Sequence, residues 1–468
     1  MQIVIDFLNT ILWNYVLIAA LLCVGVWFTV NLRFIQFRHF PEFFRLVVSA
    51  SEGDRRGITP FQALCTSLAS RVGTGNIAGV AVALTMGGPG SIFWMWVVAL
   101  LGMATAYAES TLAQLFKVRN DDGEFRGGPA FYIDRGLRAP WAAVVFSLCL
   151  ILTFGLVFNA VQANSIAEAM EASMSVPKWS VGLGLVLMAG SVIFGGVRKI
   201  ARVAELLVPV MAIGYVLLAL YVMAVNAQQV PIVLATIFKS AFGLEPAVGG
   251  VAGALLNGIK RGLYSNEAGM GSAPNIAAVA VPDPHHPSSQ GFVQALGVFI
   301  DTIVICTATA VLILMSGVLG QLPGVTGTAL TQHAFSMHVG DAGVHFIAVA
   351  VLLFAFTSII GNYAYAENAL TYLKANGVFW RTVLRLGALA MVFWGSIESV
   401  MAVFNMADAA MGLMASVNLV AIVLLSPIVF KLTRDYFAQK QAGVPCFNPD
   451  DYPELRDKIE VSVWQKSS

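Results

Sequence analysis

Long apolar segments recur from residue 10 to residue 431, and they constrain the fold more than any other feature of the sequence. A helix that crosses a bilayer needs about 20 mostly apolar residues, and polar or Pro/Gly-rich breaks separate eleven windows of about that size. The windows are 10–31, 61–86, 91–116, 140–171, 180–197, 202–226, 254–281, 291–317, 343–372, 379–397 and 405–431. Because lipid offers the backbone no hydrogen bonds, such segments fold as helices. We therefore predict an all-α polytopic membrane protein with about 11 transmembrane helices.

Composition agrees with this class. Apolar residues make up 58% of the chain and charged residues 11%, whereas soluble domains have about 25% charged residues. The net charge of +1 gives no reason to expect binding to nucleic acid. No Lys or Arg precedes Arg33, so the basic start of a cleaved signal peptide is missing and the first apolar segment is expected to remain. Cys446 carries no prediction, and the four other cysteines are expected to be small packing residues.

Basic residues indicate the orientation, because loops on the cytoplasmic side are enriched in Lys and Arg. With the N-terminus outside, the inner loops hold Arg33, Arg38, Arg45, Arg55, Arg56, Lys117, Arg119, Arg126, Arg135, Arg138, Arg198, Lys199, Arg202, Lys374 and Arg381. The outer loops hold little beyond Lys178 and Lys239. We predict a multi-pass protein of the plasma membrane, a bacterial inner membrane, with its C-terminus in the cytoplasm. The charged, proline-containing tail 432–468 is expected to be solvated and to have no fold of its own.

Two glycine-broken polar clusters, 73–76 and 269–272, lie inside apolar segments of the two halves of the chain. Irregular backbone survives at membrane depth only where protein buries it or where it lines a cavity. Paired breaks of this kind indicate a binding site of a transporter. The alternative is that these glycines only let helices pack closely.

Setting the first helix aside leaves two groups of five segments, and each group begins with a broken one. Five is odd, so the second group enters the membrane from the opposite side, as an inverted repeat requires. We divide the chain into an N-terminal helix with a basic loop, a first repeat, an outer connection, a second repeat and a tail. Their bounds are 1–60, 61–226, 227–253, 254–431 and 432–468.

Polar side chains in mid-segment are candidate ligands. In the fourth segment we favour a substrate contact for Gln162, against the alternative of hydrogen bonds between helices. In the ninth segment, the adjacent hydroxyls of Thr357 and Ser358 could bind a small cation together with carbonyls freed at the first break. Either hydroxyl could instead bond a carbonyl of its own helix.

Ionisable residues inside the membrane are functional candidates. Arg71 precedes the first break by two residues, and Glu109, Glu267 and Asp301 are the carboxylates available to it. The sequence does not choose among them, and a structural ion pair and a role in binding are both open.

Motifs of other function classes are missing. The chain contains no Gly-Lys dipeptide of a phosphate-binding loop and no His-Glu-x-x-His zinc motif. The filter of potassium channels is also missing. We expect no enzyme and no cofactor, and a passive pore or an amino-acid sensor remain alternatives.

Several motifs resemble the sodium:alanine symporter family, also called alanine or glycine:cation symporters, over about residues 10–436. They are RVGTGNIAGVA (71–81), FWMW (93–96) with Ala108-Glu109, RGGP (126–129), SNEAGMGSAP (265–274) and AFTS (355–358). The resemblance implies a LeuT-like five-plus-five inverted repeat with one extra N-terminal helix. It also implies import of a small neutral amino acid, such as alanine or glycine, driven by sodium, with proton coupling as an alternative.

The resemblance also implies site residues. Thr74 and Gly75 would bind the substrate carboxylate, while Gln162 and the Gly269 carbonyl would receive its ammonium group. Sodium would lie between carbonyls around Val72 and Gly75 and the hydroxyls of Thr357 and Ser358.

Two positions depart from the pattern of the family. Arg71 stands where many members have a small residue, and Asn362 stands where many have a Trp that lines the substrate pocket. Without that large apolar wall, the family pattern does not predict which side chain the substrate carries.

Overall fold

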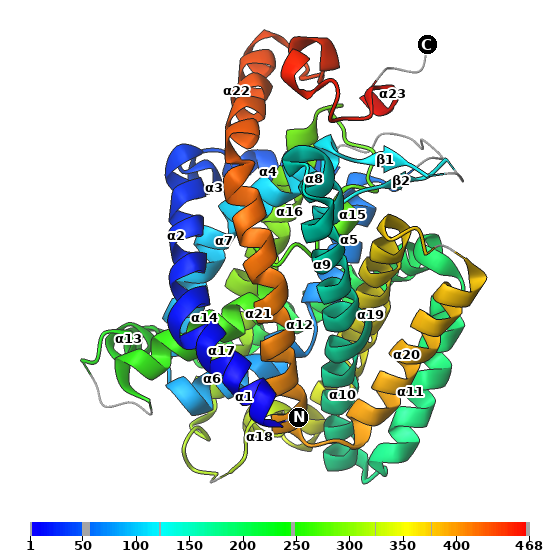
Figure 1. Cartoon of the computed structure of the whole chain (residues 1–468). Helices are drawn as coiled ribbons and strands as arrows, with labels where there is room; N and C mark the ends of the chain where they lie inside the picture. The colour runs from blue at the N-terminus through cyan, green and yellow to red at the C-terminus, as the bar shows by residue number, and fades with distance from the viewer. Residues whose placement is uncertain are drawn as a thin grey trace.

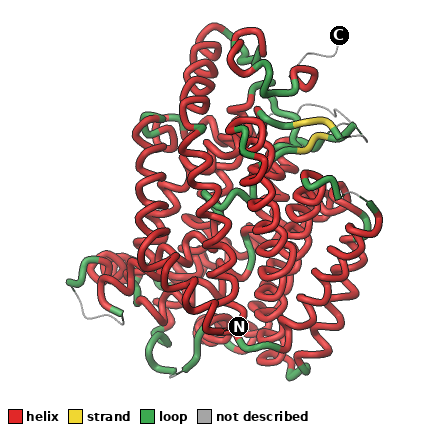
Figure 2. Tube along the Cα trace, in the orientation of Figure 1, coloured by secondary structure: helices red, strands yellow, loops and turns green. Residues whose placement is uncertain are grey.

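The computed structural model describes residues 2–48, 57–120, 123–244, 249–322, 324–375 and 377–464, and these are mostly helical (Figures 1 and 2). The helices of the first half are α1 (Gln2–Ile11), α2 (Ile18–Asn31), α3 (Ile35–Arg38), α4 (Phe40–Val48), α5 (Pro60–Arg71), α6 (Val80–Gly87), α7 (Gly90–Leu115), α8 (Pro129–Leu137), α9 (Pro140–Leu150), α10 (Phe158–Met174), α11 (Lys178–Ile193), α12 (Gly196–Val225) and α13 (Val230–Ala241). Those of the second half are α14 (Gly250–Asn266), α15 (Pro274–Ala277), α16 (Pro287–Val298), α17 (Thr307–Ser316), α18 (Gly327–Val339), α19 (Asp341–Tyr372), α20 (Val378–Ile397), α21 (Val400–Leu424), α22 (Ser426–Ala442) and α23 (Val461–Trp464). The short strands β1 (Val118–Arg119) and β2 (Phe125–Arg126) pair antiparallel, with Val118 opposite Arg126.

Among the described residues, eight helical segments are long and apolar enough to cross a membrane, which confirms a multi-pass helical protein. They are Ile3–Asn31, Gly90–Leu115, Pro140–Met174, Lys199–Val225, Pro287–Ser316, Asp341–Tyr372, Val378–Ile397 and Val400–Leu424. The three other predicted segments are also helical, but two are interrupted and Lys178–Ile193 has only 16 residues. The count of eleven crossings and the five-plus-five repeat therefore stay predictions.

The first interrupted segment consists of α5, a π-helical turn η2 (Gly75–Gly79) and α6. α5 begins at a capping box in which Thr59 and Gln62 bond each other's backbone amides, and Pro60 fixes the first turn. The helix ends at Arg71, because Val72 has a ψ of 81°, outside the helical region. The chain then turns back into a helix at Thr74.

The second interrupted segment consists of α14, an unwound stretch from Glu267 to Ala273, and the short α15. Gly269 and Gly271 have φ angles of 87° and 84°, which residues with a Cβ rarely adopt. Glu267 also has a positive φ, of 57°, which is unusual for a residue other than glycine. Pro274 begins α15, where its missing amide is no loss. Seven residues of irregular backbone are thus buried in the molecule.

Hydrogen bonds connect the two interrupted segments at the end of the molecule that carries the C-terminus. Ile58, just before α5, forms a parallel bridge with Ala280, just after α15. The Val281 amide donates to the Ile58 carbonyl at 2.9 Å. Lys117, at the end of α7, donates to the Ala280 carbonyl at 3.1 Å. We call this set of contacts the inner tie.

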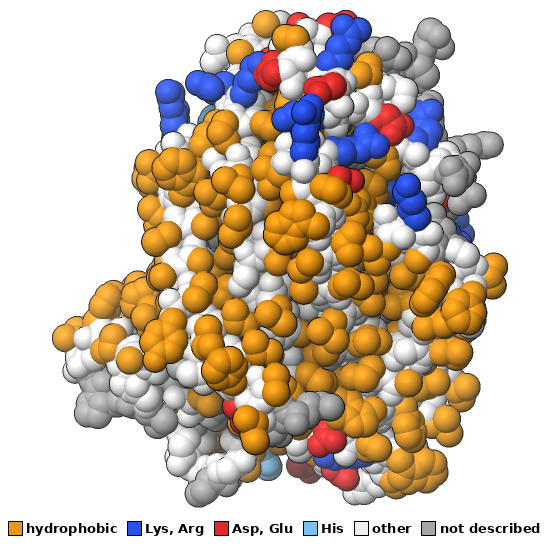
Figure 3. Space-filling model, in the orientation of Figure 1, with side chains coloured by type: hydrophobic (Ala, Val, Ile, Leu, Met, Phe, Trp, Pro, Cys, Tyr) orange, Lys and Arg blue, Asp and Glu red, His pale blue; other side chains and the backbone are white. Residues whose placement is uncertain are grey.

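The surface separates into an apolar belt and a charged end. Figure 3 shows hydrophobic side chains along the helices and Lys and Arg side chains gathered beside α22, at the top of the view. The N-terminus lies toward the opposite end (Figure 1). The gathering of basic residues supports the predicted orientation, which stays a prediction. Of the basic residues used for it, Arg55 and Arg56 lie outside the described residues.

The prediction of a solvated tail without a fold of its own is wrong for residues 432–464. Residues 432–442 continue α22, and residues 443–464 pack on the segment 115–138. Phe447, Tyr452 and Trp464 are each at most 2% exposed. The Trp464 indole donates to the Leu115 carbonyl at 3.3 Å, and Lys117 lies 5.0 Å from the Trp464 ring centroid. Charge and proline content suggested a solvated segment, but these scattered aromatic residues supply enough apolar area to fold it against the protein. The tail thereby covers the inner tie.

A polar cluster joins α22 to the tail. Asp435 accepts from the Tyr452 hydroxyl at 2.9 Å and lies 3.4 Å from the His286 ring. Burial raises the pKa of Asp435, but the bonds from His286, Gln439 and Tyr452 outweigh it and hold the pKa below its ordinary value. A lowered carboxylate pKa stabilises the folded state at neutral pH, and that contribution is lost on acidification.

We predict that the tail contributes to stability through Trp464. Trp464→Ala should lower the melting temperature of the purified protein by several degrees, because emptying a buried Trp site costs about 3 kcal/mol. Trp141→Ala is the matched control, since Trp141 is 74% exposed. Equal melting temperatures of the two variants, measured by differential scanning fluorimetry, would contradict this role of the tail.

Candidate functional site

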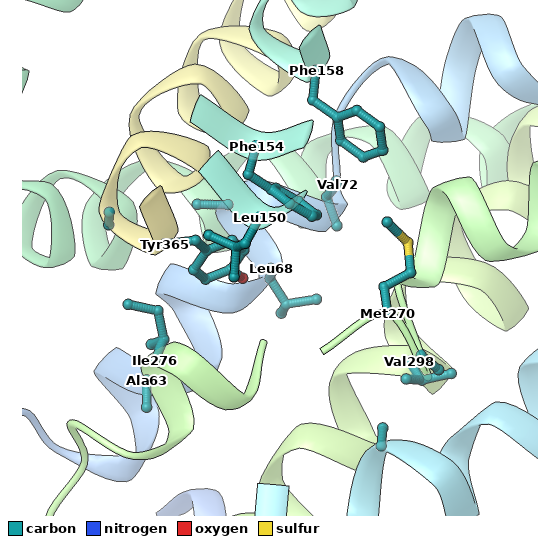
Figure 4. Close-up of a cluster of buried hydrophobic side chains, with 14 of the residues drawn as sticks. Ala63, Leu68, Val72, Leu150, Phe154, Phe158, Met270, Ile276, Val298 and Tyr365 are labelled. Carbon is teal, nitrogen blue, oxygen red and sulfur yellow. The ribbon is translucent and has the colours of Figure 1, made fainter. Parts of the chain in front are cut away.

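The two breaks lie in the middle of the protein, inside a cluster of buried apolar side chains. Figure 4 shows Val72 of the first break and Met270 of the second, with Phe158 beside them. Val72 and Met270 are both fully buried. Polar groups freed at the breaks therefore need partners from the protein, because an unpaired buried amide or carbonyl costs about 1–3 kcal/mol.

Gln162 of α10 meets the first break. Its side-chain oxygen accepts from the Thr74 amide at 3.1 Å. Gly73 makes this approach possible, since a Cβ at position 73 would lie 2.8 Å from the Gln162 oxygen and 2.3 Å from the Ser358 hydroxyl. The predicted contact residues Thr74, Gln162 and Ser358 therefore come together around Gly73.

The two predicted cation ligands of α19 differ in position. The Ser358 hydroxyl donates to the Ala69 carbonyl in the last turn of α5 at 2.9 Å, and to the Phe354 carbonyl at 3.1 Å. Among the described residues, the Thr357 hydroxyl forms one hydrogen bond, to the Phe354 carbonyl of its own helix at 2.8 Å. Both hydroxyls thus bond a carbonyl of their own helix, the alternative that the sequence left open, and Ser358 in addition lies beside the first break.

A second polar cluster surrounds Asn76 and Asp301. The Asn76 side chain accepts from the Gly73 amide at 3.0 Å and donates to the Asp301 carboxylate at 2.6 Å. Ser265 and Thr302 each donate a hydroxyl to the same carboxylate at 2.7 Å. Asp301 is fully buried. The hydrogen bonds of this oxygen-rich cluster connect the first break to the last turn of α14 and to the π-helical turn η4 (Phe299–Cys306).

The second break is held by Glu109 and Asn418. The Gly269 amide donates to one Glu109 oxygen at 3.3 Å, and Asn418 donates to the other at 2.9 Å. Asn418 also donates to the Gly269 carbonyl at 3.0 Å, and its own oxygen accepts from the Tyr132 hydroxyl. The Gly269 carbonyl, which the resemblance assigns to an ammonium group, thus already accepts one hydrogen bond from Asn418 and has a second lone pair for another donor. No hydrogen bond joins Gly269 to Gln162 among the described residues.

Asn362 and Glu267 share one partner, Ser70, in the last turn of α5. The Ser70 hydroxyl lies 2.7 Å from the Asn362 oxygen and 3.0 Å from Glu267. Asn362 also donates to Asn159 of α10 at 3.2 Å. This chain links α10, α19 and both interrupted segments, so Asn362 lies among polar partners beside α5.

Arg71 is 2% exposed and donates to the Gln294 carbonyl at 3.2 Å. Among the described residues, no carboxylate lies within 4.0 Å of its guanidinium. The structure therefore gives Arg71 a backbone partner in α16 in place of a direct ion pair with Glu109, Glu267 or Asp301.

An aromatic layer closes the site toward the end of the molecule opposite the tail. Tyr264 packs against Phe158 and Phe404 with ring centroids 5.0 Å and 5.7 Å apart. The Tyr264 hydroxyl lies 3.4 Å from that of Thr74. The rings of Phe158, Tyr264 and Phe404 thus lie against the first break on the side that faces away from the tail.

The sequence indicated the breaks, the charged residues and Gln162, and Asn76 lies in the polar cluster 73–76, although its side-chain bonds were not predicted. Three further residues that hold the site were missed. Ser265 belongs to a long motif and could have been found there, whereas Asn418 and Ser70 carry no local signal. Their roles come from contacts between helices that are distant in the sequence.

Comparisons with known proteins show the family to which this chain is similar. Residues 1–448 match the family model described as the sodium:alanine symporter family. The chain is 49% identical to a protein named uncharacterized transporter from Haemophilus influenzae, over 97% of this chain and 95% of that one. It is 46% identical to the amino-acid carrier protein AlsT of Bacillus subtilis, over 97% and 96%. It is also 46% identical to the probable sodium/glutamine symporter GlnT of the same organism, over 99% and 96%.

We predict that the close approach at Gly73 is required for the first break. Gly73→Ala should destabilise the protein by about 1–3 kcal/mol, because the added methyl group displaces Gln162 and Ser358. Gly79→Ala is the matched control from the same motif, since its Cβ would meet nothing closer than 3.7 Å. Thermal unfolding of both variants tests the prediction, and a Gly73→Ala protein as stable as Gly79→Ala would refute it.

Proposed function

Because the chain belongs to the sodium:alanine symporter family, we propose that it imports a small neutral amino acid, alanine or glycine, driven by an inward sodium gradient. The observation that carries this proposal is the meeting of two interrupted helices at one buried polar site. A broken helix offers amides to an anion at one end and carbonyls to a cation at the other. Substrate and ion can then share the site, and the protein works by alternating access.

The Thr74 amide is the proposed partner of the substrate carboxylate. It begins the helix that continues through η2 and α6, where amides attract anions. At present the Gln162 oxygen accepts from this amide. Binding of a carboxylate would release Gln162, and its freed oxygen could then accept from the ammonium group. Gly75 and the carbonyl of Gly269 complete the proposed site, and Asn362 is its more distant polar neighbour.

The charges at the breaks support coupling to a cation. Glu109, Glu267 and Asp301 are each at most 1% exposed, and Arg71 is the one cationic side chain of this set. If all four were ionised, the set would carry two uncompensated negative charges at membrane depth, which is costly. A bound sodium ion or a proton removes part of this cost. The proposed sodium site is formed by carbonyls at Val72 and Gly75 with Ser358 and Thr357.

Glutamine is a second candidate substrate, because a relative at 46% identity is named a probable sodium/glutamine symporter. Asn362 adds a polar side chain on α19 close to the site, which would suit a substrate amide better than a Trp would.

We predict that the purified protein in proteoliposomes accumulates alanine or glycine when sodium is higher outside. Replacing sodium by choline should abolish the accumulation at every pH tested, because the coupling ion is missing. Uptake that follows a pH gradient without sodium would show proton coupling. Flux that is not saturable and never uphill would show a passive pore, and binding without flux would show a sensor.

Single replacements should separate the two hydroxyls of α19. Ser358→Ala should raise the sodium concentration for half-maximal uptake about tenfold, the effect of losing about 1.4 kcal/mol of binding free energy. Thr357→Ala should change it less, because the hydrogen bond of the Thr357 hydroxyl goes to its own helix and not to the first break. An unchanged sodium dependence in both variants would remove both hydroxyls from the ion site.

A further inference from the structure

A cavity of about 670 Å³ lies at the end of the molecule opposite the tail. Residues of α6, α14 and α21 line it, together with the loop that precedes α18. With the predicted orientation, this end faces the outside of the cell. We call the cavity the outer pocket.

The wall of the outer pocket carries two cationic side chains and one carboxylate. Arg261 of α14 holds both oxygens of Asp408 on α21, each at 2.6 Å. The ammonium group of its neighbour Lys260 lies 3.8 Å from the same carboxylate. Among the described residues that line the pocket, Asp408 is the one carboxylate beside two cations, so the lining carries one excess positive charge.

Arg261 also keeps free donors. Its Nη2 atom makes the bonds to Asp408, whereas its Nε and Nη1 atoms have no hydrogen-bond partner in the part of the chain that the structure describes. Its side chain is only 4% exposed. A buried cationic donor without a partner is costly, so an anion that reaches these atoms from the pocket gains a charge-assisted bond.

The remaining wall limits which anion fits. Leu84, Leu330 and Met401 line the pocket with apolar side chains. A polyanion such as a phosphate would meet Asp408 and too few cations. A monocarboxylate with a small aliphatic part matches both the single excess charge and the apolar wall. An ammonium group on the same molecule would compete with Arg261 and Lys260 for Asp408, so the pocket recognises the molecule by its carboxylate.

The outer pocket adjoins the central site. The Arg261 guanidinium lies 5.8 Å from the ring centroid of Tyr264 and 5.3 Å from that of Phe404. Both rings belong to the aromatic layer that covers Thr74. A molecule held by Arg261 is therefore separated from the first break by a single layer of side chains.

From this geometry we propose that the outer pocket is a second binding site, in which Lys260 and Arg261 hold the carboxylate of an amino acid before it passes the aromatic layer. The proposal rests on the proposed function for the identity of the amino acid. The carboxylate site itself rests on the side chains of the pocket.

Equilibrium dialysis of the purified full-length protein with radiolabelled alanine and saturating sodium tests this proposal. The wild type should bind two alanine molecules per chain. Lys260→Gln, and the charge-neutral pair Arg261→Gln with Asp408→Asn, should each bind one. Gln162→Ala should also bind one, because it weakens only the central site. Lys178→Gln is the matched control, since Lys178 pairs with Glu168 and Glu171 outside the pocket, and it should bind two.

Propionate, a carboxylate without an ammonium group, separates this proposal from the proposed function. Its affinity should fall about tenfold in Lys260→Gln, as expected for losing one charge-assisted bond of about 1.4 kcal/mol. If alanine does not bind but propionate binds through Lys260, the result supports the carboxylate site in the outer pocket and contradicts the proposed transport of alanine. One alanine per chain in both wild type and Lys260→Gln, with equal propionate affinity, would overturn the outer site and leave the central site standing. Size-exclusion chromatography checks the folding of each variant.

Discussion

The structure depends on how polar side chains replace the backbone hydrogen bonds that two interrupted helices give up at membrane depth. Gln162 and Asn76 bond amides of the first break, and Glu109 and Asn418 bond the amide and carbonyl of Gly269. Without these partners each freed group would cost about 1–3 kcal/mol. The partners belong mostly to other helices, so the breaks exist only in the folded protein. A substrate or ion that competes for one of these bonds consequently acts on the packing of several helices.

The two ends of this site are closed by different means. Toward the tail, backbone bonds between Ile58 and residues 279–281 form the inner tie, and Trp464 covers it. Toward the opposite end, Tyr264 packs between Phe158 and Phe404, and Phe404 lines the outer pocket. Rings can change rotamer more easily than a tie of several hydrogen bonds can open. If the protein works by alternating access as proposed, opening toward the tail requires release of the inner tie.

Much of this arrangement could be predicted from the sequence, because the bilayer restricts the fold so strongly. Apolar windows located the helical segments, and the glycines at 73 and 269 located the breaks. The contacts of Asn362 and Gly269 could not be predicted, because they depend on how helices far apart in the sequence pack. A local pattern cannot show that the Gly269 carbonyl already accepts a hydrogen bond from Asn418. The folded tail was missed for a related reason: Phe447, Tyr452 and Trp464 are too scattered to form an apolar period, and they are buried only because the inner loops offer them a surface.

The central claim is that the paired breaks form one shared site for an amino acid and its coupling ion. An experimental structure of the protein with alanine and sodium, determined by cryo-electron microscopy, tests it most directly. We expect both helices to be interrupted as described, with density for alanine between the Thr74 amide and Gln162. Two continuous helices, or alanine bound away from both breaks, would contradict it.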